Sequence, residues 1–126
     1  MANILLVEDD ISVRILAARA IETAGHSVTL ADDGDEGLAA ICAAEGGFDL
    51  VVSDIRMPAM DGIEMAKAAA ARYPGLRILL MTGYAEQRER AADLNGIVLD
   101  VLSKPFTLAE IRERVARALA AEPVAA

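Results

Sequence analysis

The sequence predicts an α/β fold in which one parallel sheet has helices on both faces. Short runs of aliphatic and β-branched residues alternate with longer segments that carry apolar residues at helical spacing. Glycine, proline and asparagine interrupt the chain between these segments. Strands that alternate with helices form parallel sheets, because the chain must cross over the sheet before it adds the next strand.

The composition is that of one folded domain. The chain has 126 residues, of which 55% are hydrophobic and 25% charged, and a chain of this length buries enough surface to fold without disulfides. We expect a domain over residues 1–121 and a short tail over residues 122–126. The single cysteine, Cys42, lies in an apolar helical segment and is expected to be a small core residue.

The charge and the missing motifs exclude several classes of protein. The formal net charge of −8 disfavours binding to nucleic acid and to anionic membranes. No apolar run approaches the roughly 20 residues of a membrane span, and the N-terminal residues lack the pattern of a secretory signal. The glycine-rich nucleotide motifs and the Cys/His spacing of zinc sites are also missing from the sequence. We therefore predict a cytoplasmic protein that contacts neither nucleic acid nor membrane.

Five strands are expected where aliphatic and β-branched residues run together between breakers. In chain order these runs are residues 3–7, 27–31, 49–53, 77–82 and 97–102. The third run, with Leu50, Val51 and Val52, is typical of a strand buried on both faces.

Five helices are expected between and after these strands. They cover residues 11–24, 35–45, 62–73, 86–94 and 108 to about 121, and breakers follow the first four. The first and last are amphipathic. Their apolar faces are formed by Val13, Leu16, Ala17, Ala20 and Ile21 in the first helix and by Leu108, Ile111, Val115 and Leu119 in the last.

Three helix starts carry capping signals. Thr107 with Glu110 three residues later forms a capping box for the last helix. Asp61 is expected to cap the third helix. Asp10 is either a metal ligand or the cap of the first helix, and its place just before that helix favours the cap.

Polar side chains are expected to gather at one edge of the sheet, because parallel strands all end at the same edge. Ligands of open α/β sheets bind beyond this edge. The polar residues that end or follow the strands are Glu8, Asp9 and Asp10 for the first strand, Asp54 for the third, Thr82 for the fourth, and Lys104 with Pro105 for the fifth.

The carboxylates at this edge need a cation between them. Two carboxylates about 4 Å apart repel each other by about 4 kcal/mol at an effective dielectric constant of about 20. Oxygen ligands with room for water suit Mg²⁺, and Lys104 supplies a second positive charge. A carboxylate beside two cations can attack a phosphoryl group, because the cations neutralise the charge of the transferring oxygens. The sequence therefore predicts that Asp54 is a nucleophile that becomes an aspartyl phosphate.

Four segments together resemble the receiver domain of two-component response regulators. They are ILLVEDD, DLVVSDIRMPAMDG, LLMTGY and LSKPF, in this order, and the resemblance covers nearly the whole chain. It implies a flavodoxin-like (βα)5 three-layer sandwich with a five-stranded parallel sheet in the order 2-1-3-4-5. It also implies a signalling protein and not an enzyme, since receivers catalyse only their own phosphorylation and slow dephosphorylation.

The same resemblance assigns roles at the acidic edge. Asp54 corresponds to the phosphoacceptor. Asp9 corresponds to a direct Mg²⁺ ligand and Glu8 to one that acts through water. The backbone carbonyl of Arg56 completes the ligands that the protein offers to the metal.

The resemblance also assigns the switch, with one departure. Thr82 corresponds to the switch hydroxyl, Lys104 to the lysine that pairs with the phosphoryl group, and the bond to Pro105 is expected to be cis. Receivers usually carry an aromatic residue where this chain has Val101. Tyr84, two residues after Thr82, either takes over the aromatic switch or shields the phosphoryl group, and the sequence leaves both alternatives open.

Within the receivers, the chain resembles the CpdR type, single-domain receivers of alphaproteobacteria that control proteolysis by ClpXP. The segments DIRMPAMDGIEMA, LLMTGYAEQRERA and LDVLSKPFTLAEIR carry this finer resemblance. It implies a histidine kinase or histidine phosphotransfer protein as phosphodonor, ClpX or ClpXP and its substrates as partners, and a monomer or weak dimer. The unphosphorylated form would act as the protease adaptor. The alternative is a phosphate sink or shuttle without an adaptor role.

Two further features have a functional and a plain interpretation. The arginines of the last two helices are either solvated faces, which is the more common case, or a docking surface for partners. The C-terminal EPVAA resembles the small apolar ends that bacterial AAA+ proteases grip, or it is simply the frayed end of an alanine-rich helix.

Overall fold

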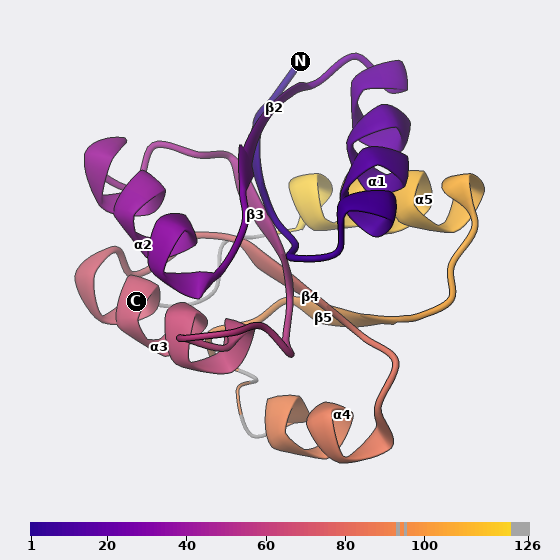
Figure 1. Ribbon diagram of the computed structural model, residues 1–126. Helices are drawn as coiled ribbons and strands as arrows, with labels where there is room; N and C mark the ends of the chain where they lie inside the picture. The colour runs from indigo at the N-terminus through magenta and orange to yellow at the C-terminus, as the bar shows by residue number, and fades with distance from the viewer. Residues whose placement is uncertain (93, 95, 122–126) are drawn as a thin grey trace.

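The computed structural model describes residues 1–121 except residues 93 and 95, and the side chains of residues 85 and 92 are not described. Its five strands are β1 (Asn3–Val7), β2 (Ser27–Ala31), β3 (Leu50–Asp54), β4 (Ile78–Thr82) and β5 (Asp100–Ser103). They form one parallel sheet in the order β2-β1-β3-β4-β5 (Figure 1). The predicted α/β class is therefore confirmed, together with the strand order that the resemblance implies. The expected tail, residues 122–126, lies outside the described residues.

Helices cover both faces of the sheet. α1 (Ile11–Thr23) and α5 (Leu108–Ala120) pack on one face. α2 (Gly34–Ala43), α3 (Gly62–Arg72) and α4 (Ala85–Ala92) cover the other face. Among the described residues, no helix combines the length and the apolar character that a membrane crossing requires.

The strands agree closely with the sequence prediction except at β5. β3 ends one residue later than expected, so that Asp54 is its last residue. β5 begins at Asp100 and not at residue 97, because the backbone N–H groups of Ile97 and Val98 both donate to the carbonyl of Leu94 in a turn. The apolar residues before β5 therefore belong to this turn, although Val98 is buried.

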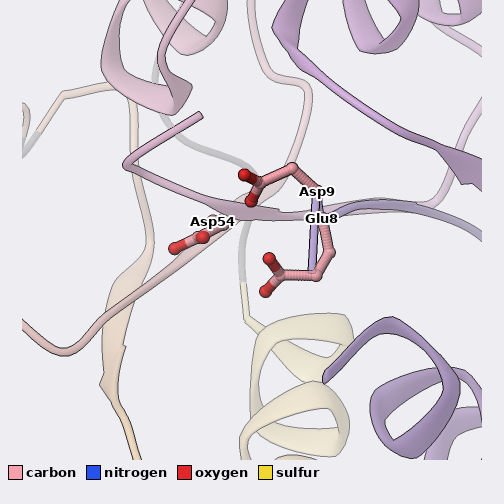
Figure 2. Close-up of side chains that lie close together, drawn as sticks. All are labelled: Glu8, Asp9 and Asp54. Carbon is pink, nitrogen blue, oxygen red and sulfur yellow. The ribbon is translucent and has the colours of Figure 1, made fainter. Parts of the chain in front are cut away.

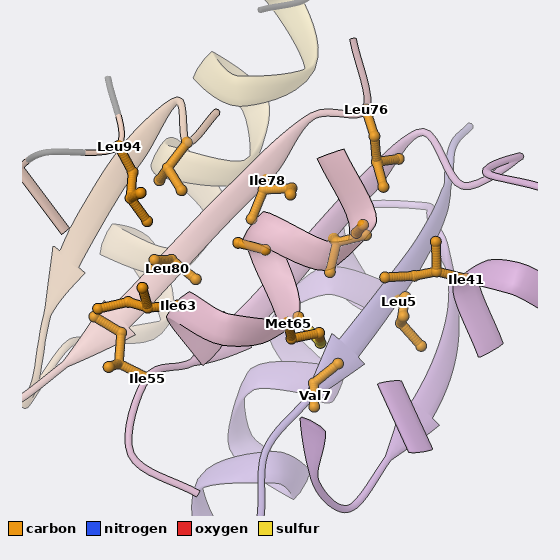
Figure 3. Packing of buried hydrophobic residues seen from close by; sticks show 14 of the residues in the cluster. Leu5, Val7, Ile41, Ile55, Ile63, Met65, Leu76, Ile78, Leu80 and Leu94 are labelled. Carbon is orange, nitrogen blue, oxygen red and sulfur yellow. The ribbon is translucent and has the colours of Figure 1, made fainter. Parts of the chain in front are cut away.

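Each face of the sheet has its own apolar core, because successive side chains of a strand point to opposite faces. The core under α2, α3 and α4 contains Leu5 and Val7 of β1, and Figure 3 shows part of it. The core under α1 and α5 contains Ile4 and Leu6. β3 and β4 are buried along their whole length, as expected for central strands of a parallel sheet. The residues at their carboxyl ends are thus held on well-packed strands.

The three predicted helix caps are confirmed. The Asp10 carboxylate accepts backbone N–H groups in the first turn of α1. Asp61 caps α3 in a capping box with Glu64, and Thr107 caps α5 in a capping box with Glu110. These contacts satisfy N–H groups that a helix leaves unpaired at its start.

Three expectations about burial were wrong. Leu16 and Leu108 are 40% and 38% exposed, although their spacing predicts buried faces. α1 meets the sheet through the smaller side chains of Ala17 and Ala20, while Leu16 lines a pocket beyond the sheet edge. Cys42 is only partly buried and is not one of the core residues.

Candidate functional site

Three carboxylates converge at the carboxyl edge of the sheet. Glu8 and Asp9 follow β1, and Asp54 ends the neighbouring strand β3, where Val7 lies opposite Ser53. Each of the three acidic residues offers a carboxylate oxygen that lies within 4.8 Å of the other two, and Figure 2 shows the side chains drawn together. The parallel register brings these residues together as the sequence predicts.

Lys104 places a positive charge between two of these carboxylates. Its Nζ atom lies 2.8 Å from Oε1 of Glu8 and 3.1 Å from Oδ2 of Asp54. The lysine follows β5, and its backbone N–H donates to the carbonyl of Thr82 at 2.8 Å. The peptide bond between Lys104 and Pro105 is cis. The ammonium group therefore reaches across β4 to the acidic cluster.

Burial shapes the electrostatics of this pair of charges. Glu8 is fully buried, and loss of water raises the pKa of its carboxyl from an ordinary 4.5 to about 7, with the hydrogen bond from Lys104 opposing the rise. The negative charge of Asp54 is a second, smaller cause of this raised pKa. Burial also acts to lower the pKa of the Lys104 ammonium, but the hydrogen bond to Glu8 and the charge of Asp54 raise it overall. Repulsion between the carboxylates is thus a smaller cause of the raised Glu8 pKa than desolvation.

Backbone groups next to Asp54 hold its side chain and main chain in place. Its side chain is nearly buried, and Oδ1 accepts the N–H of Ile55 at 2.9 Å. Gly62 at the start of α3 donates its N–H to the carbonyl of Ile55 at 2.7 Å. A Cβ atom on Gly62 would lie 2.1 Å from the carbonyl oxygen of Asp54, so only glycine fits there.

Thr82 ends β4 beside Asp54 and is 1% exposed. Its Oγ1 atom accepts the backbone N–H of Tyr84 at 3.1 Å. Tyr84 is 45% exposed as a residue, and the guanidinium carbon of Arg56 lies 5.0 Å from the centroid of its ring, within cation–π range. Val101, by contrast, packs against the core under α2, α3 and α4. In this structure Tyr84 therefore lies at the rim of the site.

A pocket of about 690 Å³ opens above these residues. Sequence reasoning found its acidic and basic lining but missed the side chain of Arg56 and the apolar wall, which consists of Val13, Leu16 and Phe106. The contact between Arg56 and Tyr84 had a signal in the sequence, since each residue comes two positions after the end of one of two adjacent strands. Asp10 also lines the pocket, but its carboxylate caps α1 and is not in the carboxylate cluster.

Comparison with known proteins identifies the family. The family model of the response regulator receiver domain matches residues 4–116. The chain belongs to this receiver family. Its resemblance to receivers in the sequence motifs is thereby confirmed, and so is the fold class that the family implies.

Curated relatives include single-domain and longer receivers. The response regulator receiver protein CpdR of Brucella abortus is 37% identical over 96% of this chain and 99% of its own length. The DNA-binding transcriptional regulator NtrC of Salmonella typhimurium is 35% identical, and there the chain spans only 24% of the relative. The match to CpdR over its full length supports the finer resemblance.

Solved receiver structures share the fold. The chemotaxis response regulator CheY4 of Vibrio cholerae superposes with a TM-score of 0.83 at 32% identity, over 94% of this chain and 98% of that one. The response regulator TrrA of Thermotoga maritima, solved in complex with Mg²⁺ and BeF, gives a TM-score of 0.83 at 28% identity over 94% and 99% of the two chains. The acidic cluster described above is in keeping with a receiver that binds Mg²⁺.

Proposed function

We propose that this protein is a stand-alone response regulator that is phosphorylated on Asp54 in a Mg²⁺-dependent reaction in the cytoplasm. A histidine kinase or a histidine phosphotransfer protein supplies the phosphoryl group, and phosphorylation changes which partner the receiver binds. One observation carries this proposal: Asp54 lies in a cluster of three carboxylates and pairs with Lys104 at 3.1 Å.

The donor set fits Mg²⁺. Glu8, Asp9 and Asp54 offer hard oxygen ligands within 4.8 Å of one another, and the backbone carbonyl of Arg56 is the fourth group that the protein would supply. The open pocket leaves room for waters and a phosphoryl oxygen. When bound, Mg²⁺ neutralises charge on the transferring phosphoryl group.

In the proposed reaction an Asp54 carboxylate oxygen forms a bond to phosphorus. The bond from phosphorus to the donor's histidine nitrogen breaks, and the leaving imidazole keeps the electron pair. Lys104, which pairs with the free Asp54 carboxylate, then pairs with the new phosphoryl oxygens and neutralises part of their charge. Thr82 has its hydroxyl hydrogen available to donate to the phosphoryl group, because its contact with the Tyr84 N–H uses only an oxygen lone pair.

The match to CpdR supports a finer proposal for the output. We propose that the unphosphorylated receiver acts as an adaptor that controls proteolysis by ClpXP, and that the protein is a monomer or weak dimer. This rests on 37% identity over 96% of the chain. The alternative is a phosphate sink or shuttle, which accepts and loses phosphoryl groups without changing partner. A pull-down with ClpX, with and without phosphodonor, separates the two, since only an adaptor gives phosphate-dependent capture.

The phosphorylation itself is tested by intact-mass measurement after incubation with Mg²⁺ and acetyl phosphate. We expect one acid-labile phosphoryl group on the wild type and none on Asp54→Asn. Asp35→Asn is a matched control, since Asp35 is an exposed carboxylate in the first turn of α2, and it should be labelled like the wild type. Equal labelling of Asp54→Asn would contradict the assignment of the nucleophile.

A further inference from the structure

We propose that Arg14 is a positioning residue that holds the main chain of Glu8, so that the adjacent Asp9 faces Asp54 in a geometry that binds Mg²⁺. The proposal rests on the Mg²⁺-dependent function proposed above. Arg14 lies in α1 and is not one of the metal ligands proposed above. Its side chain is 17% exposed and points back to the end of β1.

Asp9 is the carboxylate whose direction needs an explanation. It is exposed, and within the described part of the chain no hydrogen bond or ion pair holds its carboxylate. Glu8 and Asp54, by contrast, are both held by Lys104. The direction of the Asp9 side chain therefore depends on the backbone on either side of it.

The backbone before Asp9 is held on both of its polar groups. The N–H of Glu8 donates to the carbonyl of Ala31 in β2 at 3.1 Å. The carbonyl of Glu8 accepts Nη1 of Arg14 at 3.1 Å. The Ala31 contact continues the β1–β2 pairing, whereas the Arg14 contact is made by a side chain alone.

Arg14 also joins two loops. The same guanidinium nitrogen that contacts the Glu8 carbonyl is ion-paired with Asp32, which follows β2. The two hydrogens of Nη1 lie in the plane of the rigid guanidinium and so have fixed directions, whereas a lysine ammonium rotates freely at the end of a flexible stem. The contact thus ties the loop after β1 to the loop after β2.

The loss of Arg14 has opposite effects on Mg²⁺ binding if the residue acts through its charge or through its positioning contact. A positive group near three carboxylates opposes the approach of Mg²⁺, so its loss strengthens binding if charge is the only role. Loss of a positioning contact weakens binding, because groups that orient metal ligands contribute to metal affinity. The sign of the change therefore distinguishes the two roles.

The test is isothermal titration of the metal-free full chain with MgCl₂, with thermal melts to confirm that each variant is folded at the titration temperature. We expect Arg14→Ala to raise the Kd for Mg²⁺ about tenfold. The double variant Arg14→Ala/Asp32→Asn keeps the wild-type net charge and should show the same weakening. Arg19→Ala removes an exposed positive charge from the same helix and should leave the Kd unchanged or slightly lower.

Arg14→Lys guards against loss of folding, because it keeps the charge and most of the stem. We expect it to melt near the wild type and to bind Mg²⁺ about threefold more weakly, since the rigid, planar guanidinium is lost. An unchanged or lower Kd in folded Arg14→Ala or Arg14→Lys overturns the role of Arg14 alone. Failure of the wild type to bind Mg²⁺ overturns both this inference and the proposed function.

Discussion

Helices α3 and α4 cover the same face of the sheet, but different forces hold them there. α3 buries Ile63, Met65, Ala66 and Ala69 in the core. In α4, Ala91 is the one buried side chain among those described. Apolar burial therefore fixes α3, whereas α4 depends on polar contacts to its neighbours.

The polar contacts of α4 join it to the start of α3 and to the end of β5. Arg90 pairs at 2.9 Å with Asp61, the residue that caps α3, and Arg88 contacts Ser103 at the end of β5. Such half-exposed pairs each contribute about 0–1 kcal/mol. The loop after Asp54 therefore joins a helix that is held by apolar burial, whereas the segment after Thr82 joins a helix that is held by weak contacts.

The largest effect is expected where α3 meets Asp54. Gly62→Ala would place a Cβ atom 2.1 Å from the Asp54 carbonyl, so we expect a loss of about 3 kcal/mol or more in the free energy of unfolding. Gly83→Ala on the α4 side is the matched control, because its Cβ atom would lie 3.6 Å from the nearest atom, the Cβ of Lys104. Urea denaturation of both variants measures the difference. Equal losses would show that the two sides do not differ in packing.

The second prediction concerns pH and metal. The folded-state pKa of Glu8 is raised to about 7 from 4.5, so its contribution to stability is full below about pH 4.5 and is lost as the pH rises through about 7. In metal-free protein the wild type should therefore lose, between these limits, on the order of 3 kcal/mol relative to Glu8→Gln. Thermal melts across this range measure the loss, and parallel pH curves of the two proteins would contradict it.

Mg²⁺ should oppose this loss, because it binds the folded state and stabilises it by mass action. We expect millimolar Mg²⁺ to raise the melting temperature of the wild type at neutral pH. NaCl at the same ionic strength is the control, because a monovalent salt screens charges without filling a site of hard oxygen ligands. Melts that do not respond to Mg²⁺ would count against the metal site.

Tyr84 tests the link between the site and α4, and its effect should be smaller. In the observed position the ring lies against Arg56 at the pocket rim, which favours shielding of the phosphoryl group. Tyr84→Ala should then keep phosphorylation of Asp54 and phosphate-dependent partner binding, but should lose phosphate faster because water reaches phosphorus more easily. If Tyr84 is instead the switch, the variant loses the difference in partner binding. Dephosphorylation rate and partner affinity, measured together, decide, and no change in either would contradict both.

Most of the fold could be predicted from the sequence, and so could the convergence of the charged residues at the site, because both follow from the pattern of parallel strands. Parallel strands end at one edge, so Glu8, Asp54 and Lys104 could be placed together from strand ends alone. The exposure of Leu16 could not be predicted, because helical spacing gives a face but not how much of that face the sheet covers. Long-range side-chain contacts, such as that of Arg14 with the Glu8 carbonyl, depend on loop geometry that periodicity does not contain.

We predict that phosphorylation of Asp54 shifts α4 while α3 stays in place, because apolar burial holds α3 whereas half-exposed polar contacts hold α4. The test is amide hydrogen exchange measured by mass spectrometry, with and without acetyl phosphate in the presence of Mg²⁺. We predict a several-fold change in exchange of the backbone of α4, little change in α3, and no change in either helix of Asp54→Asn. Exchange that changes equally in both helices, or in neither helix of the fully phosphorylated protein, would contradict the claim.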